Sequence, residues 1–85
     1  MTHRVEISRA AEKVIVALDG VMQKRVRTAL RDLAETPRPD GCVKMKGDFA
    51  GRYRVRVGTV RVVYSIDDGA LVVLVVMVEK RGDIY

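Results

Sequence analysis

The fold is decided by residues 52–78, which read RYRVRVGTVRVVYSIDDGALVVLVVMV. The stretch is rich in β-branched and aromatic residues and is divided by turn signals at Gly58-Thr59 and at residues 67–69, Asp-Asp-Gly. Strands are therefore predicted at residues 52–57, 60–66 and 70–78, joined as an antiparallel meander. The last strand is apolar on both faces, so we expect it to lie in the interior of the sheet.

The first half of the chain predicts one strand and two helices. Residues 4–7 alternate as a short strand, and Ser8 is a plausible N-cap for a helix that ends at Gly20. A second helix is predicted from Val21 to the loop at residues 36–41. The apolar positions expected to face the core are Ala11, Val14, Ile15 and Leu18 in the first helix and Val21, Met22, Val26, Ala29, Leu30 and Leu33 in the second.

A brief extended piece at residues 43–47 and a turn at residues 48–51 complete the order β-α-α-β-β-β. The predicted fold class is α+β, with a small, mostly antiparallel sheet and a helical hairpin packed on one face. With 85 residues and no internal repeat, the chain is expected to form one domain over residues 1–85.

Composition excludes several classes of protein. Hydrophobic residues at 48% and charged residues at 32% fit a folded globular chain, and no apolar run reaches the roughly 20 residues of a membrane-spanning helix. The N-terminal residues lack the apolar stretch of a secretory signal, so we expect a cytoplasmic protein without a membrane partner. Cys42 is the single cysteine and His3 the single histidine, which predicts neither a disulfide nor a metal site.

The balance of charge points to an anionic partner. The formal net charge is +5, which favours nucleic acid only if the cations gather on one surface. The second predicted helix carries Lys24, Arg25, Arg27 and Arg31 on its outer face. This pattern is typical of a solvated helix, and less often of a contact with an anionic partner.

The predicted strand at residues 52–57 has one cationic face. The two-residue period of a strand places Arg52, Arg54 and Arg56 together, with Tyr53 and the valines on the other face. Arg61 from the next strand is expected near Arg56, directly across the hairpin or diagonally. Like charges on neighbouring strands destabilise a sheet, so a bound polyanion would explain the cluster, although a solvated strand face remains the alternative.

No hydrolase constellation is visible in the sequence. His3 is isolated, Ser8 and Ser65 have no candidate base, and no glycine-rich phosphate loop occurs. RNA carries its own nucleophile in the 2′-hydroxyl, so a protein can cleave it by aligning that group and stabilising the developing charge. Arginines and a tyrosine are suited to this task.

Four segments carry a family resemblance. They are Lys44-Met45-Lys46-Gly47, Tyr53-Arg54-Val55-Arg56-Val57, Val60-Arg61-Val62-Val63-Tyr64 and Glu79-Lys80-Arg81-Gly82-Asp83-Ile84-Tyr85. In order and spacing the chain resembles the RelE family of toxin–antitoxin ribonucleases. The resemblance implies a toxin that inhibits translation by cutting messenger RNA in the ribosomal A site through attack of the 2′-hydroxyl, and that is inhibited by a RelB-like antitoxin. It implies an endoribonuclease that needs no metal or other cofactor.

The resemblance also implies the site residues. The catalytic positions correspond to Arg54, Arg56, Arg61, Arg81 and Tyr85. We assign contacts with RNA or the ribosome to Lys44, Lys46 and Arg52 and, on the second helix, to Lys24, Arg27 and Arg31. Relatives often carry lysine where Arg54 and Arg56 stand, and arginine is a very poor base. The general base is therefore open, with Tyr85 as one candidate.

Two other functions remain open. The ParE type of toxin shares the fold but poisons DNA gyrase and lacks the RelE catalytic set, so Arg61, Arg81 and Tyr85 favour RelE. A non-catalytic module that binds RNA or the ribosome would use the same basic face.

Overall fold

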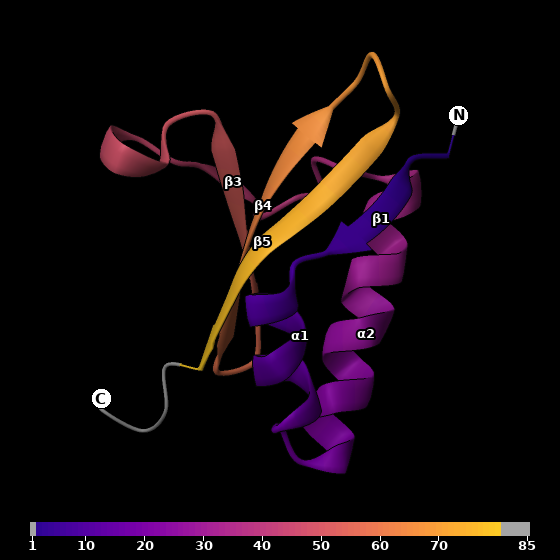
Figure 1. Cartoon of the computed structure of the whole chain (residues 1–85), viewed down its shortest axis with the longest axis vertical. Coiled ribbons are helices and arrows are strands. Elements are labelled where there is room, and N and C mark those ends of the chain that lie inside the picture. The colour runs from indigo at the N-terminus through magenta and orange to yellow at the C-terminus, as the bar shows by residue number, and fades with distance from the viewer. Residues whose placement is uncertain (1, 81–85) are drawn as a thin grey trace.

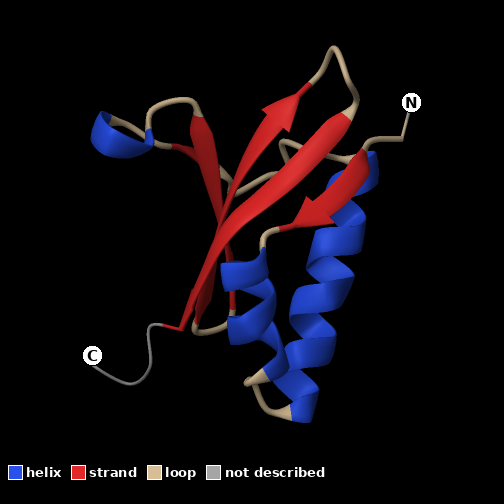
Figure 2. Cartoon of the chain, in the orientation of Figure 1, coloured by secondary structure: helices blue, strands red, loops and turns tan. Residues whose placement is uncertain are grey.

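The protein is described here by a computed structural model over residues 2–80, apart from the side chain of Phe49. Two α-helices pack against one side of a five-stranded sheet (Figures 1 and 2). The elements are β1 (Arg4–Ile7), α1 (Arg9–Val16), α2 (Gly20–Glu35), β2 (Val43–Lys44), a 3₁₀ turn η1 (Gly47–Phe49), β3 (Arg52–Val57), β4 (Val60–Asp67) and β5 (Val72–Lys80). The predicted α+β class is confirmed, and the order differs by one strand, because part of the extended piece at residues 43–47 pairs with β3 as the two-residue strand β2.

The strands of the sheet lie in the order β1-β5-β4-β3-β2. β5 is parallel to β1 and antiparallel to β4, so the valine-rich strand lies inside the sheet as its composition predicts. A bulge in the pairing of β4 with β5, next to Val63 and Tyr64, shifts the register by one residue. As a result Val75 and Val78, three positions apart, both reach the core.

The first helix begins where the sequence predicts and ends earlier. The Ser8 hydroxyl accepts a hydrogen bond from the Ala11 N–H at 3.1 Å and caps α1. The helix stops at Val16, and Gly20, predicted to end it, is instead the first residue of α2. The reason is Asp19, whose carboxylate accepts from the Met22 N–H at 2.9 Å and starts a second helix immediately.

The second helix faces the core with a narrower stripe than predicted. Val26, Leu30 and Leu33 are buried and lie three or four residues apart along one face. Val21 falls outside this row and is 73% exposed, so its assignment to the core was wrong. None of the helices within residues 2–80 is long and apolar enough to cross a membrane.

The core fills the space between the helices and the sheet. Tyr64 is its largest fully buried side chain, and valines of β4 and β5 surround it. Tyr53, Val55 and Val57 of β3 pack against the same cluster from the edge of the sheet. The helices cover this face only, and within residues 2–80 no helix covers the opposite face of β3, β4 and β5, which we call the open face (Figure 1).

Candidate nucleic-acid interface

β3 divides its side chains between the two faces of the sheet. The side chains of Tyr53, Val55 and Val57 pack on the core. By alternation, the open face receives Arg52, Arg54 and Arg56, as the sequence predicts. Within residues 2–80, neither Arg54 nor Arg56 forms an ion pair. The open face therefore carries two guanidinium charges, those of Arg54 and Arg56, that no carboxylate of the described residues neutralises.

The β3–β4 hairpin brings a further arginine to this face. Its register pairs Arg56 directly with Arg61, which settles the choice left open by the sequence. The turn is tight because Gly58 has a φ of +59°, a left-handed conformation that favours glycine. A Cβ at Gly58 would lie 2.8 Å from the Met22 Cε, so the turn also packs closely against the first turn of α2.

Arg61 is largely buried on this face. Its side chain is only 20% exposed, and its Nη1 lies 3.6 Å from the Glu79 Oε1 on β5. Its Nε is buried and has no hydrogen-bond partner among the described residues. Buried donors are nearly always satisfied, and an exception calls for an explanation such as a missing ligand. A phosphate oxygen would satisfy this donor.

Three rows of side chains cross the open face from β3 to β5. The first contains Arg56, Arg61 and Glu79, the second Arg54, Val63 and Met77, and the third Arg52, Ser65 and Leu74. We call the first the arginine–glutamate row. It lies beside the β3–β4 turn, at the end of the sheet where the described part of β5 also ends (Figure 1).

The other cations expected at the site lie elsewhere. The register pairs Lys44 with Tyr53, which places Lys44 on the face opposite Arg54. Lys46 is exposed in the loop that precedes η1. Lys24 and Arg31 are exposed on α2, on the helical side of the sheet. The structure thus separates the arginines of the open face from these lysines and from the helix cations.

Arg27 has a partner within the helical hairpin. Its Nη2 donates to the Glu12 Oε2 of α1 at 2.7 Å. This hydrogen bond lowers the pKa of the Glu12 carboxyl and raises that of Arg27. Arg81 and Tyr85 lie outside the described residues. Lys80, which precedes Arg81 in the chain, pairs with Val60 at the end of the arginine–glutamate row.

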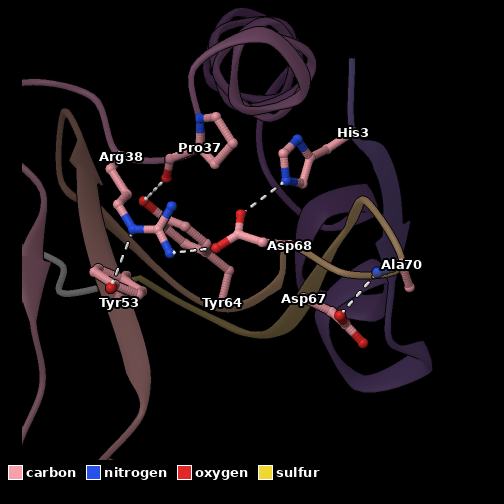
Figure 3. Close-up of polar contacts among 8 residues, drawn as sticks. All are labelled: His3, Pro37, Arg38, Tyr53, Tyr64, Asp67, Asp68 and Ala70. Carbon is pink, nitrogen blue, oxygen red and sulfur yellow. Dashed lines mark hydrogen bonds and ion pairs between the residues drawn. The ribbon is translucent and has the colours of Figure 1, made fainter. Parts of the chain in front are cut away.

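A second polar cluster, which we call the polar clamp, lies at the opposite end of the sheet (Figure 3). Arg38, from the loop after α2, donates to the Asp68 Oδ2 at 3.0 Å and to the Tyr53 hydroxyl at 3.2 Å. Its guanidinium also lies over the Tyr53 ring, 5.3 Å from the centroid. On the other side of Asp68, the His3 Nε2 lies 3.2 Å from Oδ1.

Tyr64 anchors the polar clamp to the core. Its hydroxyl donates to the Pro37 carbonyl at 2.8 Å, and its ring stacks on Tyr53 with centroids 5.9 Å apart. Burial raises the pKa of the Tyr64 phenol, so it stays protonated as a donor. Sequence reasoning missed this cluster. The only local signal was the Pro37-Arg38-Pro39 loop, because its other members are distant in sequence.

The described residues offer no metal site. Within residues 2–80, no three side chains of His, Cys, Asp or Glu gather as a metal ion would require. What the open face offers is charge, with guanidinium groups that can each grip a phosphate through two hydrogen bonds.

Comparison with known proteins gives the family. A family model described as the ParE toxin of type II toxin–antitoxin systems matches residues 5–85. The chain belongs to this toxin family. A curated relative, Toxin RelG of Mycobacterium tuberculosis, is 37% identical over 60 residues, which cover 71% of this chain and 68% of RelG. The resemblance to the RelE/ParE toxins is confirmed.

Solved structures agree with this assignment. The RelBE2 toxin–antitoxin complex of Mycobacterium tuberculosis contains a chain with a TM-score of 0.87 and 25% identity, covering 98% of this chain and 95% of that one. The archaeal RelE–RelB complex from Pyrococcus horikoshii gives a TM-score of 0.84 and 28% identity, with 96% and 98% covered. The described fold is therefore the RelE-like fold.

Proposed function

We propose that this toxin is a ribosome-dependent endoribonuclease that cuts messenger RNA in the A site and so inhibits translation. The observation that carries the proposal is the direct pairing of Arg56 with Arg61 on an uncovered sheet face, with the buried Arg61 Nε lacking a partner among the described residues. Repulsion between paired cations costs stability, and a bound phosphodiester offsets that cost.

The chemistry proposed for this face needs no protein nucleophile. The 2′-hydroxyl of the substrate attacks the adjacent phosphorus, and charge accumulates on the phosphoryl oxygens in the transition state. Arg61 would clamp the scissile phosphate, and Arg56 would neutralise the developing charge, with Arg54 and Arg52 holding the neighbouring backbone. Every one of these roles depends on charge, so no metal ion or organic cofactor is required.

Residues outside the described range complete the proposed site. Arg81 follows Lys80, whose pairing with Val60 carries the chain to the end of the arginine–glutamate row. There Arg81 would stabilise the leaving oxygen, and Tyr85 would stack on a base or orient the 2′-hydroxyl. Lys44, Lys46, Lys24, Arg27 and Arg31 would contact ribosomal or messenger RNA from other surfaces, acting on affinity rather than on the chemical step.

A RelB-like antitoxin is the proposed regulatory partner, and the cytoplasm the proposed location. Both solved structures named above are complexes of a toxin with its antitoxin. By analogy, the chain is held inactive by a cognate antitoxin and acts on ribosomes when that antitoxin is lost.

The proposal is tested by mapping messenger ends in a reconstituted translation system by primer extension. Wild-type protein is expected to produce ends confined to codons in the A site, whereas Arg61→Met and Arg81→Ala should produce far fewer of these ends in the same time. An intact messenger in the presence of folded wild-type protein would overturn the proposal. Ribosome binding without cleavage would instead support the non-catalytic module.

The second candidate is a gyrase poison of the ParE type, which the family match itself favours. It is examined with the same preparation in a DNA supercoiling assay. Inhibition of gyrase together with an intact messenger would select this function. It would also leave Arg61→Met with no special effect, because the RelE catalytic set is then not in use.

A further inference from the structure

The arginine–glutamate row contains a carboxylate that the proposed function has not yet used. Register pairs Arg56 with Arg61 and Arg61 with Glu79, so the three side chains stand side by side on the open face of β3, β4 and β5. Glu79 is 44% exposed, and its Oε1 lies 3.6 Å from the Arg61 Nη1. A substrate phosphate held by Arg61 would therefore lie next to this carboxylate.

Glu79 is the only carboxylate in the three rows, as far as the described residues go. The lysines of the strands do not replace it as a base. Lys80 pairs with Val60, whose side chain is in the core, so alternation directs Lys80 to the helical face. Lys44 is likewise placed on that face by its pairing with Tyr53. Arginine itself stays protonated at any working pH and cannot accept the proton.

We propose that Glu79 is the general base, which accepts the proton of the attacking 2′-hydroxyl. The proposal rests on the proposed ribonuclease function and deepens it. A base must lie within hydrogen-bond reach of the proton it removes. The 2′-hydroxyl and the phosphorus it attacks lie about 3–3.5 Å apart in a reactive geometry. A carboxylate next to the phosphate-binding arginine meets this requirement.

The Glu79 carboxylate takes the proton as the 2′-oxygen forms a bond to phosphorus and the bond from phosphorus to the 5′-oxygen breaks. The departing 5′-oxygen takes a proton from water or from an acidic side chain, and the products are a 2′,3′-cyclic phosphate and a 5′-hydroxyl. Arg61 and Arg56 hold the phosphoryl oxygens throughout and do not transfer protons.

The carboxylate has opposite effects on binding and on chemistry. Its negative charge repels the RNA phosphates, so Glu79 opposes binding while it promotes cleavage. Replacement by glutamine removes the charge and the basic oxygen, yet it keeps the size of the side chain and leaves an amide oxygen in the place beside Arg61. Glu79→Gln therefore distinguishes a general base from a residue whose role is only to position Arg61.

The experiment measures single-turnover cleavage on ribosomes carrying a defined A-site codon, and affinity for the same complex with a 2′-deoxy codon that cannot be cut. For Glu79→Gln we expect cleavage at least about 100-fold slower, with affinity unchanged or up to about fivefold tighter. The matched control is Glu6→Gln. Glu6 is also a carboxylate on the open face and is paired with an arginine, Arg4, at 2.8 Å, but it lies on β1. The control should cleave like wild type.

A second substrate shows whether Glu79 accepts the proton of the 2′-hydroxyl or acts on the leaving group. An RNA with sulfur in place of the 5′-bridging oxygen has a leaving group that needs no proton. Glu79→Gln should remain slow on this substrate, since attack by the 2′-hydroxyl still lacks its base. Full rescue would show that Glu79 acts on the leaving group and would overturn the assignment.

Other outcomes are equally informative. Cleavage by Glu79→Gln at the wild-type rate, or equal losses in Glu79→Gln and Glu6→Gln, would reject the inference and leave the ribonuclease function standing. Weaker binding together with slower cleavage would reject the base in favour of a positioning role. A wild-type protein that cuts nothing would reject the ribonuclease function, and the inference with it.

Discussion

The two ends of the sheet use arginine in opposite ways. In the polar clamp, Arg38 has a carboxylate, a hydroxyl and an aromatic ring as partners. In the arginine–glutamate row, Arg61 faces another arginine and one carboxylate, and its buried Nε has no partner within residues 2–80. Arg38 thus has its partners within the described chain, although the His3 Nδ1 of the same cluster is also buried without a partner there, whereas Arg61 keeps a guanidinium donor that an anion could accept from. The difference separates an arginine that stabilises the fold from one available for a ligand.

Replacing each of these two arginines by methionine tests the difference between them, because methionine keeps much of the alkyl stem of arginine and removes its charge. For Arg61→Met we expect cleavage of A-site codons to slow by about 100- to 1000-fold, the loss typical of one electrostatic donor. Stability should stay the same or rise, since a half-satisfied, largely buried cation is removed. Single-turnover kinetics and thermal denaturation measure the two effects. A large loss of stability with unchanged cleavage would reverse the assignment.

The core end of the polar clamp should give the next largest effect. Tyr64→Phe removes the hydroxyl that donates to the Pro37 carbonyl at 2.8 Å. A loss of about 1–2 kcal/mol in the free energy of unfolding is expected, because that carbonyl loses its partner in a part-buried setting. Urea denaturation measures the loss. Cleavage by the folded variant should match wild type, and a loss of cleavage would place Tyr64 in the site.

Arg38→Met is the counterpart of Arg61→Met and tests the outer part of the clamp. It should lower the melting temperature by less than Tyr64→Phe, because the Arg38–Asp68 ion pair is exposed to solvent. Cleavage should be unchanged. If Arg38→Met impaired cleavage as strongly as Arg61→Met, the distinction between the two ends would fail.

The smallest expected effect is on the stability of the fold at low pH. Hydrogen bonds from Arg38, and secondarily His3, lower the pKa of Asp68 in the folded state. Its stabilising contribution is present above the unfolded pKa of about 3.9 and is lost as the pH falls through the lower folded value. Wild type should therefore be slightly more stable than Asp68→Asn at pH 7, and the difference in stability should be smaller at pH 3. Urea denaturation at both pH values measures this difference, and a difference that grows at pH 3 would contradict the prediction.

Short-range patterns accounted for most of the fold. The alternation in residues 52–57 predicted which face each arginine of β3 takes, since a strand offers only two faces. Ser8 predicted the start of α1 because capping is a local interaction. The boundary between the helices was missed because Asp19 and Gly20 can serve either as the end of one helix or as the start of the next.

Long-range pairing decided what the sequence left open. The face of Lys44 depends on the register of a two-residue strand, which no local pattern fixes. His3, Arg38 and Asp68 meet only because β1, the loop after α2 and the β4–β5 turn reach the same end of the sheet (Figure 3). The partnership of Arg61 with Glu79 likewise depends on the register of β4 and β5.

The most direct test of the central claim uses a messenger with one 2′-O-methyl group at the scissile nucleotide of the A-site codon. The arginines of the open face supply charge and no nucleophile, so cleavage requires the 2′-hydroxyl of the RNA. The account predicts that wild-type protein cuts the unmodified messenger to a 2′,3′-cyclic phosphate and leaves the methylated one intact. Cleavage of both messengers at the same codon would contradict it.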